Sequence, residues 1–265
     1  MAEPKVWIRA GIMMMYGSSI DADYHRHHAI QLVWPKPESR CTLCLRAETL
    51  SSNGLSHVVS KEIAAPMILA SNVEHQLQME EGWIVLLEPS GELGAAMNQL
   101  LAQRPIEMLP KLHFSRPRAS DIKLDDVAIH LLSLLEHLKQ PSPFYLNNNS
   151  NIIDPRIKRL VDELYQCVGV TCLKPNAWRA ADVAATLALS ESRFLHLFRQ
   201  EVGIPWRPYL LWCRMICAVE AVLAGQSATE AAYMAGFSDS AHLSRTFRHT
   251  FGMTIRQANA VFRRS

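Results

Sequence analysis

The sequence contains no long apolar run and few cysteines, and both absences narrow the class of protein. None of its 265 residues lies in a stretch close to the ~18 consecutive apolar residues of a membrane span. The start, MAEPKVWIRAG, lacks a charged segment followed by an apolar one, so we expect no secretory leader. Six scattered cysteines are too few for a secreted disulfide framework. We therefore expect free thiols, a cytoplasmic location and no membrane partner.

Acidic and basic residues are unevenly distributed along the chain. Residues 1–151 hold 13 Lys/Arg against 16 Asp/Glu, a net charge of −3, and the rest holds 14 against 9, or +5. The apolar content of 49% and the charged content of 20% are typical of a globular protein, and the length fits two domains. The C-terminal part is the better candidate for binding a polyanion.

Signatures of catalysis and of metal binding are also missing. Cys41 and Cys44 belong to an alternating run and therefore lie on opposite faces of a predicted strand. Cys213 and Cys217 share a helix face and are interpreted as small buried apolar residues. We find no nucleophile beside a base, no phosphate loop and no acid pair on a glycine-rich turn. We expect no enzymatic activity, no catalytic residue and no cofactor.

The order of predicted elements gives an α+β protein with a small N-terminal β-barrel and an all-helical C-terminal domain. Short strand-like runs extend from Val6 to about Leu87 and predict a barrel over residues 1–90. Residues 91–140 have helical periodicity, and a proline- and asparagine-rich linker covers 141–152. The helical segment carries a heptad-like apolar seam, which predicts either a dimer interface or packing on its own barrel: Leu124, Val127, Leu131, Leu134 and Leu138.

A repeated unit occurs in the helical domain, residues 153–265. In each copy two apolar residues lie four positions apart. Arginine directly follows the second apolar residue, and glycine comes five positions after that same apolar residue. The residues are Phe194, Phe198, Arg199 and Gly203 in the first copy and Leu243, Phe247, Arg248 and Gly252 in the second. An alanine-rich short helix and a turn precede each copy, and Ser190 and Ser238 or Asp239 are predicted helix caps. This arrangement is a duplicated helix-turn-helix.

Helices that bury those apolar residues turn a polar, basic face outward. The residues expected to contact DNA are Ser192, Leu195, His196 and Arg199 in the first unit, and Ser240, Ala241, Ser244, Arg245 and Arg248 in the second. Arginine suits guanine because it forms a bidentate pair there, and Leu195 suits a thymine methyl group. The predicted helix over 205–225 spans about 30 Å, close to the about 34 Å of one DNA turn.

The segment AAYMAGFSDSAHLSRTFRHTFGMTIRQ resembles the DNA-binding domain of the AraC/XylS family of bacterial transcriptional regulators, over roughly 155–263. The resemblance implies two helix-turn-helix subdomains joined by a long helix. It adds His242 to the base-facing residues. It also implies double-stranded promoter DNA as partner, RNA polymerase if the protein is an activator, a homodimer, and a bacterial cytoplasmic, nucleoid-associated location.

The N-terminal region, from DADYHRHHAIQLVWP to PMILASNVEHQL, resembles the small cupin-like barrel that senses a ligand in this family. The positions matching the metal ligands of cupins are His25, His27, Gln31 and His75. Because Gln31 replaces a carboxylate, we expect no metal. An apolar effector pocket lined by Trp34 or Trp83, a metal site, and a plain core with hydrogen-bonded histidines remain as alternatives. His28 points the other way and is expected to be solvated.

These observations predict a sequence-specific DNA-binding transcriptional regulator switched by a small molecule in the barrel. Its effector-binding residues would be His25, His27, Gln31, Trp34, His75 and Trp83. The alternative is a cupin-type metal-dependent enzyme with a helical appendage, which requires a bound transition metal with an open coordination position.

Overall fold

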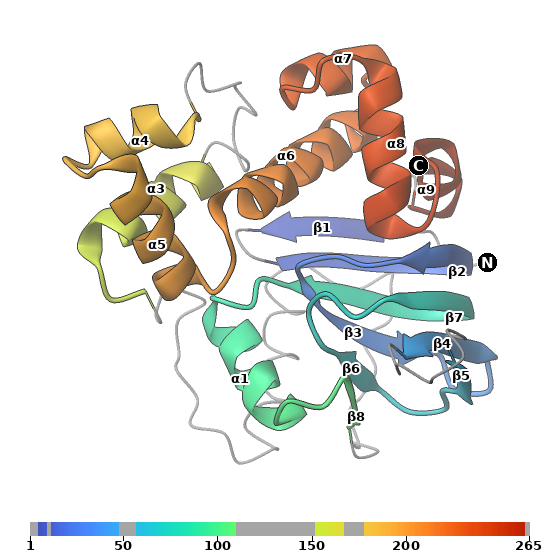
Figure 1. Cartoon of the computed structure of the whole chain (residues 1–265). Coiled ribbons are helices and arrows are strands. Elements are labelled where there is room, and N and C mark those ends of the chain that lie inside the picture. The colour runs from blue at the N-terminus through green and yellow to red at the C-terminus, as the bar shows by residue number, and fades with distance from the viewer. Residues whose placement is uncertain (1–4, 10–11, 48–56, 110–151, 167–177, 263–265) are drawn as a thin grey trace.

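The computed structural model describes residues 5–9, 12–47, 57–109, 152–166 and 178–262 (Figure 1). The described residues between 5 and 109 form a curled antiparallel sheet with one helix, and those between 152 and 262 form helices and their connections. The predicted α+β class is therefore confirmed. The predicted seam from Leu124 to Leu138, and residues 141–151 of the linker, lie outside the described residues.

Eight strands of the described residues form the sheet, in the order β1-β2-β7-β3-β6-β8, with β4 pairing with both β5 and β7. Their bounds are β1 Lys5–Arg9, β2 Ile12–His25, β3 Ile30–Pro35, β4 Cys41–Ala47, β5 His57–Glu62, β6 Met67–Leu69, β7 His75–Leu87 and β8 Ile106–Met108. Strands β2 and β7 form the longest pairing, from Ile12 opposite Leu87 to His25 opposite His75. Because β8 pairs with β6, the sheet continues beyond residue 90, where the sequence placed its end.

The two faces of the sheet are buried by different helices. Helix α1, Glu92–Leu101, covers one face through Leu93, Met97 and Leu101. Trp34 and Trp83, which lie opposite each other on β3 and β7, pack in this cluster. The opposite face packs against the helical domain, in one cluster that includes residues of both. Which face a strand residue occupies therefore decides which helices it meets.

Seven described helices make up the C-terminal part: α3 Pro155–Gln166, α4 Ala180–Thr186, α5 Glu191–Val202, α6 Trp206–Leu223, α7 Ala228–Met234, α8 Ser240–Phe251 and α9 Ile255–Phe262. The pairs α4–α5 and α7–α8 form two helix-turn-helix units at opposite ends of α6 (Figure 1). Helices α8 and α9 contact β2, so the second unit is seated on the sheet.

Candidate nucleic-acid interface and the cavity behind it

Helix α5 begins at the cap that the sequence predicts. The Ser190 hydroxyl accepts a hydrogen bond from the Arg193 amide at 3.3 Å, which satisfies one of the free N–H groups of the first turn. Gly203 ends the helix in a left-handed conformation with φ of 86°. Phe194 and Phe198 are fully buried, with ring centroids 5.2 and 5.0 Å from Trp206. This packing fixes the opposite face of α5 toward solvent.

Helix α8 repeats the arrangement with a charged cap. A carboxylate oxygen of Asp239 accepts from the His242 amide at 2.7 Å, and this bond, with one from Ser238, lowers the pKa of Asp239. Leu243 and Phe247 are buried, and α8 contains no acidic residue. The preceding helix α7 starts with a capping box formed by Ser227 and Glu230. The second unit thus presents a helix whose exposed charge is positive.

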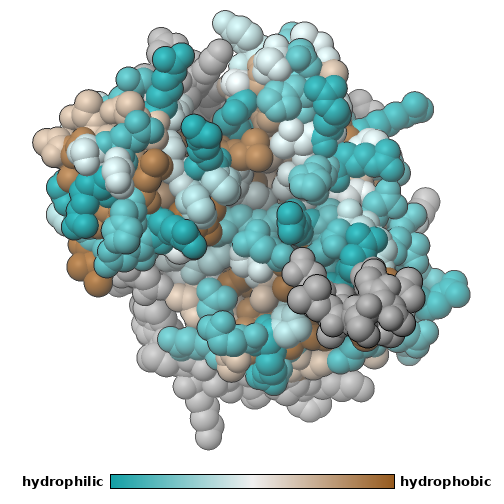
Figure 2. Space-filling model, in the orientation of Figure 1, coloured by the Kyte–Doolittle hydropathy of each residue, from teal (hydrophilic) through white to brown (hydrophobic). Residues whose placement is uncertain are grey.

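Most residues predicted to contact DNA lie on the surface. Exposed are Ser192, His196, Arg199, Ala241, Ser244, Arg245 and Arg248, whereas Leu195, Ser240 and His242 are partly buried. Leu195 packs against the hydrophobic core, and the His242 ring lies edge-on to Phe237 with a centroid distance of 5.3 Å. Figure 2 shows a largely hydrophilic surface where α7 and α8 lie and a more mixed one over α3 to α5.

Sequence reasoning missed two arginine contacts that position the second unit. Arg214 of α6 donates to the carbonyl oxygens of Ala235 and Gly236 in the turn, with its guanidinium 4.3 Å from the centre of the Phe237 ring. Arg248, predicted to bind DNA, donates to the Asp23 carboxylate of β2 at 3.0 Å, and both side chains are 62% exposed. Neither contact has a local sequence signal, because each joins segments far apart in the chain.

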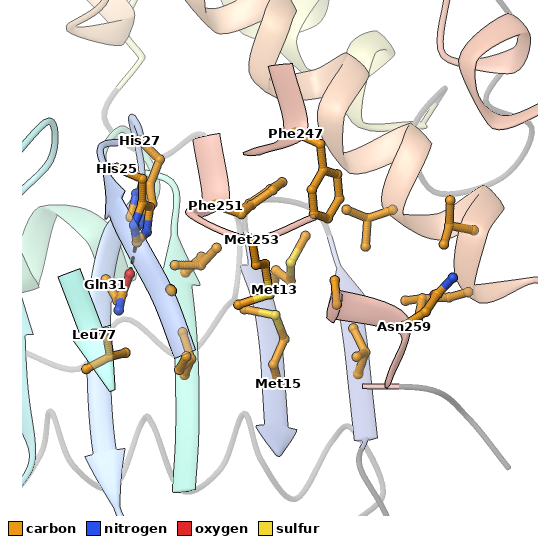
Figure 3. Close-up of a pocket in the computed structure, with 18 residues that line it drawn as sticks. Met13, Met15, His25, His27, Gln31, Leu77, Phe247, Phe251, Met253 and Asn259 are labelled. Carbon is orange, nitrogen blue, oxygen red and sulfur yellow. Dashed lines mark hydrogen bonds between the residues drawn. The ribbon is translucent and has the colours of Figure 1, made fainter. Parts of the chain in front are cut away.

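Behind α8 a cavity lies between the helical domain and the sheet (Figure 3). Apolar side chains of the sheet, including Met13 and Met15, face Phe247 and Phe251 of α8 across it. Polar groups lie at its two ends, His25, His27 and Gln31 at one and Asn259 of α9 at the other (Figure 3). The cavity therefore lies between the domains and touches the buried face of a predicted DNA-reading helix.

Four of the six predicted effector residues come together and two do not. The rings of His25, His27 and His75 are in contact, with centroids 4.2 to 5.6 Å apart. The side-chain oxygen of Gln31 lies 2.8 Å from Nε2 of His27. Trp34 and Trp83 do not line the cavity, because they lie on the sheet face that α1 covers.

The prediction that His28 is solvated is wrong. This residue is 7% exposed, and its Nε2 lies 2.7 Å from the buried carboxylate of Glu88.

Burial keeps the clustered histidines uncharged at neutral pH. Desolvation, followed by repulsion from His27, lowers the pKa of His25 to about 4. Desolvation also lowers the pKa of His27, and with repulsion from His25 it holds that of His75 well below its usual range. Neutral imidazoles have lone pairs available as hydrogen-bond acceptors or metal ligands.

Comparisons with known proteins agree with this geometry. Residues 183–260, which include helices α5 and α8, match the family model described as "Helix-turn-helix domain". The C-terminal region therefore carries a helix-turn-helix domain, and this domain is of the AraC type. Domains of this class are typical of DNA-binding regulators.

One relative resembles a segment of this sequence, and another resembles its three-dimensional fold. An uncharacterized HTH-type transcriptional regulator, YidL of Escherichia coli (strain K12), is 37% identical over 76 residues, 28% of this chain. The chain spans about a quarter, 26%, of that relative's length. A crystal structure of an apo ToxT variant from Vibrio cholerae strain SCE256 is similar with a TM-score of 0.56, at 13% identity, over 95% of this chain and 98% of that one. The two-domain architecture is thus shared with ToxT.

None of the described helices has the length and apolar character needed to cross a membrane.

Proposed function

We propose that the protein is a sequence-specific DNA-binding transcriptional regulator whose helices α5 and α8 enter successive major grooves. The observation that carries this proposal is that α5 and α8 are both capped, each exposes a polar face to solvent, and α6 lies between them in the chain. The 18 residues of α6 give a rod of about 27 Å at 1.5 Å per residue. This length is similar to the spacing of successive major grooves on one side of DNA, which is about 34 Å.

The two helices have different parts in the proposed complex. On α8, Arg245 reads a guanine, and Ser244 and Ala241 let the backbone approach closely. On α5, half-buried Leu195 offers only an apolar surface to a thymine methyl group, so that helix reads fewer bases. Arg199 and Arg248, exposed on the same helices, neutralise phosphates.

The test of this proposal is selection of binding sites from random duplex DNA with the full chain, followed by anisotropy titrations. Arg245→Ala is expected to cost about 1–3 kcal/mol on the selected site and to relax preference at one base pair. Arg199→Ala is the matched control, and it should weaken selected and random duplex about equally and reduce the salt dependence. Equal losses on both duplexes for Arg245→Ala would contradict base reading by this residue.

We also propose that an apolar small molecule with a polar end binds in the cavity and acts as effector. The methionine and phenylalanine lining, with polar groups only at the ends, supports this ligand class (Figure 3). Because Phe247 and Phe251 belong to α8, a ligand that moves them changes how the second unit is held on the sheet. The coupling is allosteric, since the effector and the DNA occupy different sites.

A thermal-shift screen of metabolites against the full chain tests the effector. Two alanines of α9 provide a matched pair of variants, since Ala258 lines the cavity and Ala260 is exposed. Ala258→Phe should abolish the shift caused by a hit, and Ala260→Phe should leave it unchanged. A hit that stabilises both variants equally binds elsewhere.

We propose a homodimer that pairs residues 120–140 of two chains, and contact with RNA polymerase if the protein activates transcription. The heptad-like spacing from Leu124 to Leu138 supports the dimer. Sedimentation of the full chain at micromolar concentration is expected to give a dimer, and Leu131→Glu with Leu134→Glu to give a monomer. A wild-type monomer would overturn the dimer.

A further inference from the structure

The cavity between the sheet and α8 is lined by few polar side chains. His25 ends β2, His27 precedes β3, and Gln31 is the second residue of β3. These three lie at one end of the cavity, and Asn259 lies at the other (Figure 3). Among the described residues, no lysine, arginine, aspartate or glutamate lines the cavity. A ligand there meets neutral polar groups, so hydrogen bonding rather than charge selects its head group.

Backbone carbonyl groups decide which ring nitrogen carries the proton in the two lining histidines. His25 Nδ1 lies 2.7 Å from the Asp23 carbonyl oxygen, and His27 Nδ1 lies 2.9 Å from that of Ala29. Because a carbonyl oxygen can only accept, each Nδ1 donates. Burial lowers the pKa of both rings, so each holds a single proton at neutral pH. Nε2 of each ring is therefore a hydrogen-bond acceptor.

The proton position in His27 also fixes the orientation of the Gln31 amide. The side-chain oxygen of Gln31 lies 2.8 Å from His27 Nε2, so two acceptors would face each other. Turning the amide over removes this conflict, because its nitrogen then donates to His27. The Gln31 oxygen is left as a further acceptor, and the amide keeps one N–H that His27 does not use.

Acceptors at this end of the cavity lack donors. In the part of the chain that the structure describes, His25 forms its hydrogen bond through Nδ1, which leaves its Nε2 without a donor. His75, whose ring centroid lies 4.2 Å from that of His25, has a buried Nε2 with no hydrogen-bond partner. A buried acceptor without a donor costs free energy. A ligand that donates a hydrogen bond here removes part of that cost, and one that only accepts does not.

We propose that the effector is an alcohol, whose apolar body packs on the methionine and phenylalanine side chains and whose hydroxyl group donates to His25 Nε2. A hydroxyl group is uncharged and can accept from the free N–H of Gln31 while it donates to His25. This inference rests on the proposed function, because it names the class of ligand for the proposed effector cavity.

Two charged head groups suit this end of the cavity less well. A carboxylate only accepts, so it would face the histidine lone pairs, and no described lining residue carries a positive charge at neutral pH to offset its lost hydration. An alkylammonium group donates, but the described lining contains no acidic side chain to pair with its charge. The cavity therefore selects a neutral donor over either ion.

The experiment is calorimetric titration of the full chain at neutral pH with octanol, octanoate and octylammonium, which share one hydrocarbon chain and differ in the head group. Octanol should bind saturably, with one molecule per chain. Octanoate should bind at least about 100-fold more weakly, and octylammonium at least about tenfold more weakly. Either ion binding as tightly as octanol would overturn the proposal.

Substitutions of His25 test where the hydroxyl group lies. His25→Leu should weaken octanol binding about tenfold, because one hydrogen bond is lost. His25→Gln keeps an acceptor and should restore most of the affinity. His249→Leu is the matched control, because His249 is exposed on α8 and does not line the cavity, and it should bind as the wild type does. Equal affinities of His25→Leu and His249→Leu would place the hydroxyl group elsewhere and overturn the proposal.

A variant with reversed preference keeps the test decisive if His25→Leu folds poorly. Gln31→Lys places a positive charge at the same end of the cavity and should make octanoate bind at least about tenfold more tightly than it binds the wild type. An unchanged affinity for octanoate would show that its carboxylate does not reach this end, and would contradict the selection argued above.

A separate measurement distinguishes this inference from the proposed function. Octanol should change the DNA affinity of the wild type and not that of Ala258→Phe, in which the cavity is filled. The expected order of the three probes with an unchanged DNA affinity would contradict the effector role and leave the preference for an alcohol standing. Octanoate that binds tightly and changes the DNA affinity would support the effector cavity and overturn the alcohol. Failure of all three probes to bind would also overturn the alcohol, whereas specific DNA binding is tested without any of them.

Discussion

At the scale of single residues, Asp154 shows how one side chain starts a helix. Its carboxylate accepts from the Arg156 amide at 2.9 Å and from the guanidinium of the same residue at 2.7 and 3.1 Å. The hydrogen bond from the Arg156 side chain is the main cause that lowers the pKa of Asp154 to about 2.

The lowered pKa of Asp154 predicts a pH-dependent contribution to stability. A depressed carboxyl pKa stabilises the fold above the unfolded value of about 4 and loses this effect as pH falls toward 2. The difference in urea midpoint between wild type and Asp154→Ala should therefore shrink from pH 5 to pH 2. Asp154→Asn, which keeps an oxygen acceptor without the charge, should fall between them at pH 5. A constant difference across that range would show that the charge contributes nothing.

Sequence alone identified the residues whose roles are local. Ser190 and Asp239 cap helices, as predicted, because a cap depends only on residues a few positions away. The burial of His28 was missed because its partner Glu88 lies 60 residues further along the chain.

At the scale of elements, two helix-ending glycines make a matched pair. Gly252 has φ of 68° and Gly203 has φ of 86°, conformations that disfavour any residue with a Cβ. A Cβ at Gly203 meets nothing within 4 Å, whereas one at Gly252 would clash with the Asp23 backbone of β2.

We therefore predict unequal effects of the same substitution. Gly203→Ala should lower the free energy of unfolding by about 1 kcal/mol, the cost of the backbone conformation alone. Gly252→Ala should cost about 2–4 kcal/mol, because α8 must also move away from β2. Urea denaturation measures both values, and equal losses would mean that α8 does not rest on the sheet.

Elements were predicted better than their mutual placement. The repeated spacing from Phe194 to Gly203 and from Leu243 to Gly252 predicted helices α5 and α8, because each helix buries one stripe of its own surface. The faces of Trp34 and Trp83 were not predictable, because strand alternation gives two faces without saying which helix covers each. The docking of α8 on β2 joins residues more than 200 positions apart and has no local pattern.

At the scale of the whole molecule, the ion pair between Asp23 and Arg248 would compete with the phosphate contact proposed for Arg248. Arg248 has to leave Asp23 to reach a phosphate, and an exposed pair of this kind is worth at most about 1 kcal/mol. Asp23→Asn should therefore raise DNA affinity by up to about fivefold at low salt, as measured by fluorescence anisotropy.

Asp21→Asn is the control for this prediction. It removes the same charge from the same strand, but Asp21 accepts a hydrogen bond from Gln78 and does not pair with Arg248. The same increase in both variants would indicate a general effect of net charge rather than release of Arg248.

The hydrophobic cluster that includes residues of both the sheet and the helices has a consequence for protein engineering. Val219, Val222 and Phe247 belong to the helical domain but are buried together with side chains of the sheet. A chimera that joins this helical domain to the sheet domain of a distant relative would have mismatched side chains at the contact between the two domains. It would fold well only if the residues on both sides of that contact were transplanted together. The proposed DNA specificity and the proposed response to an effector would then be transferred together.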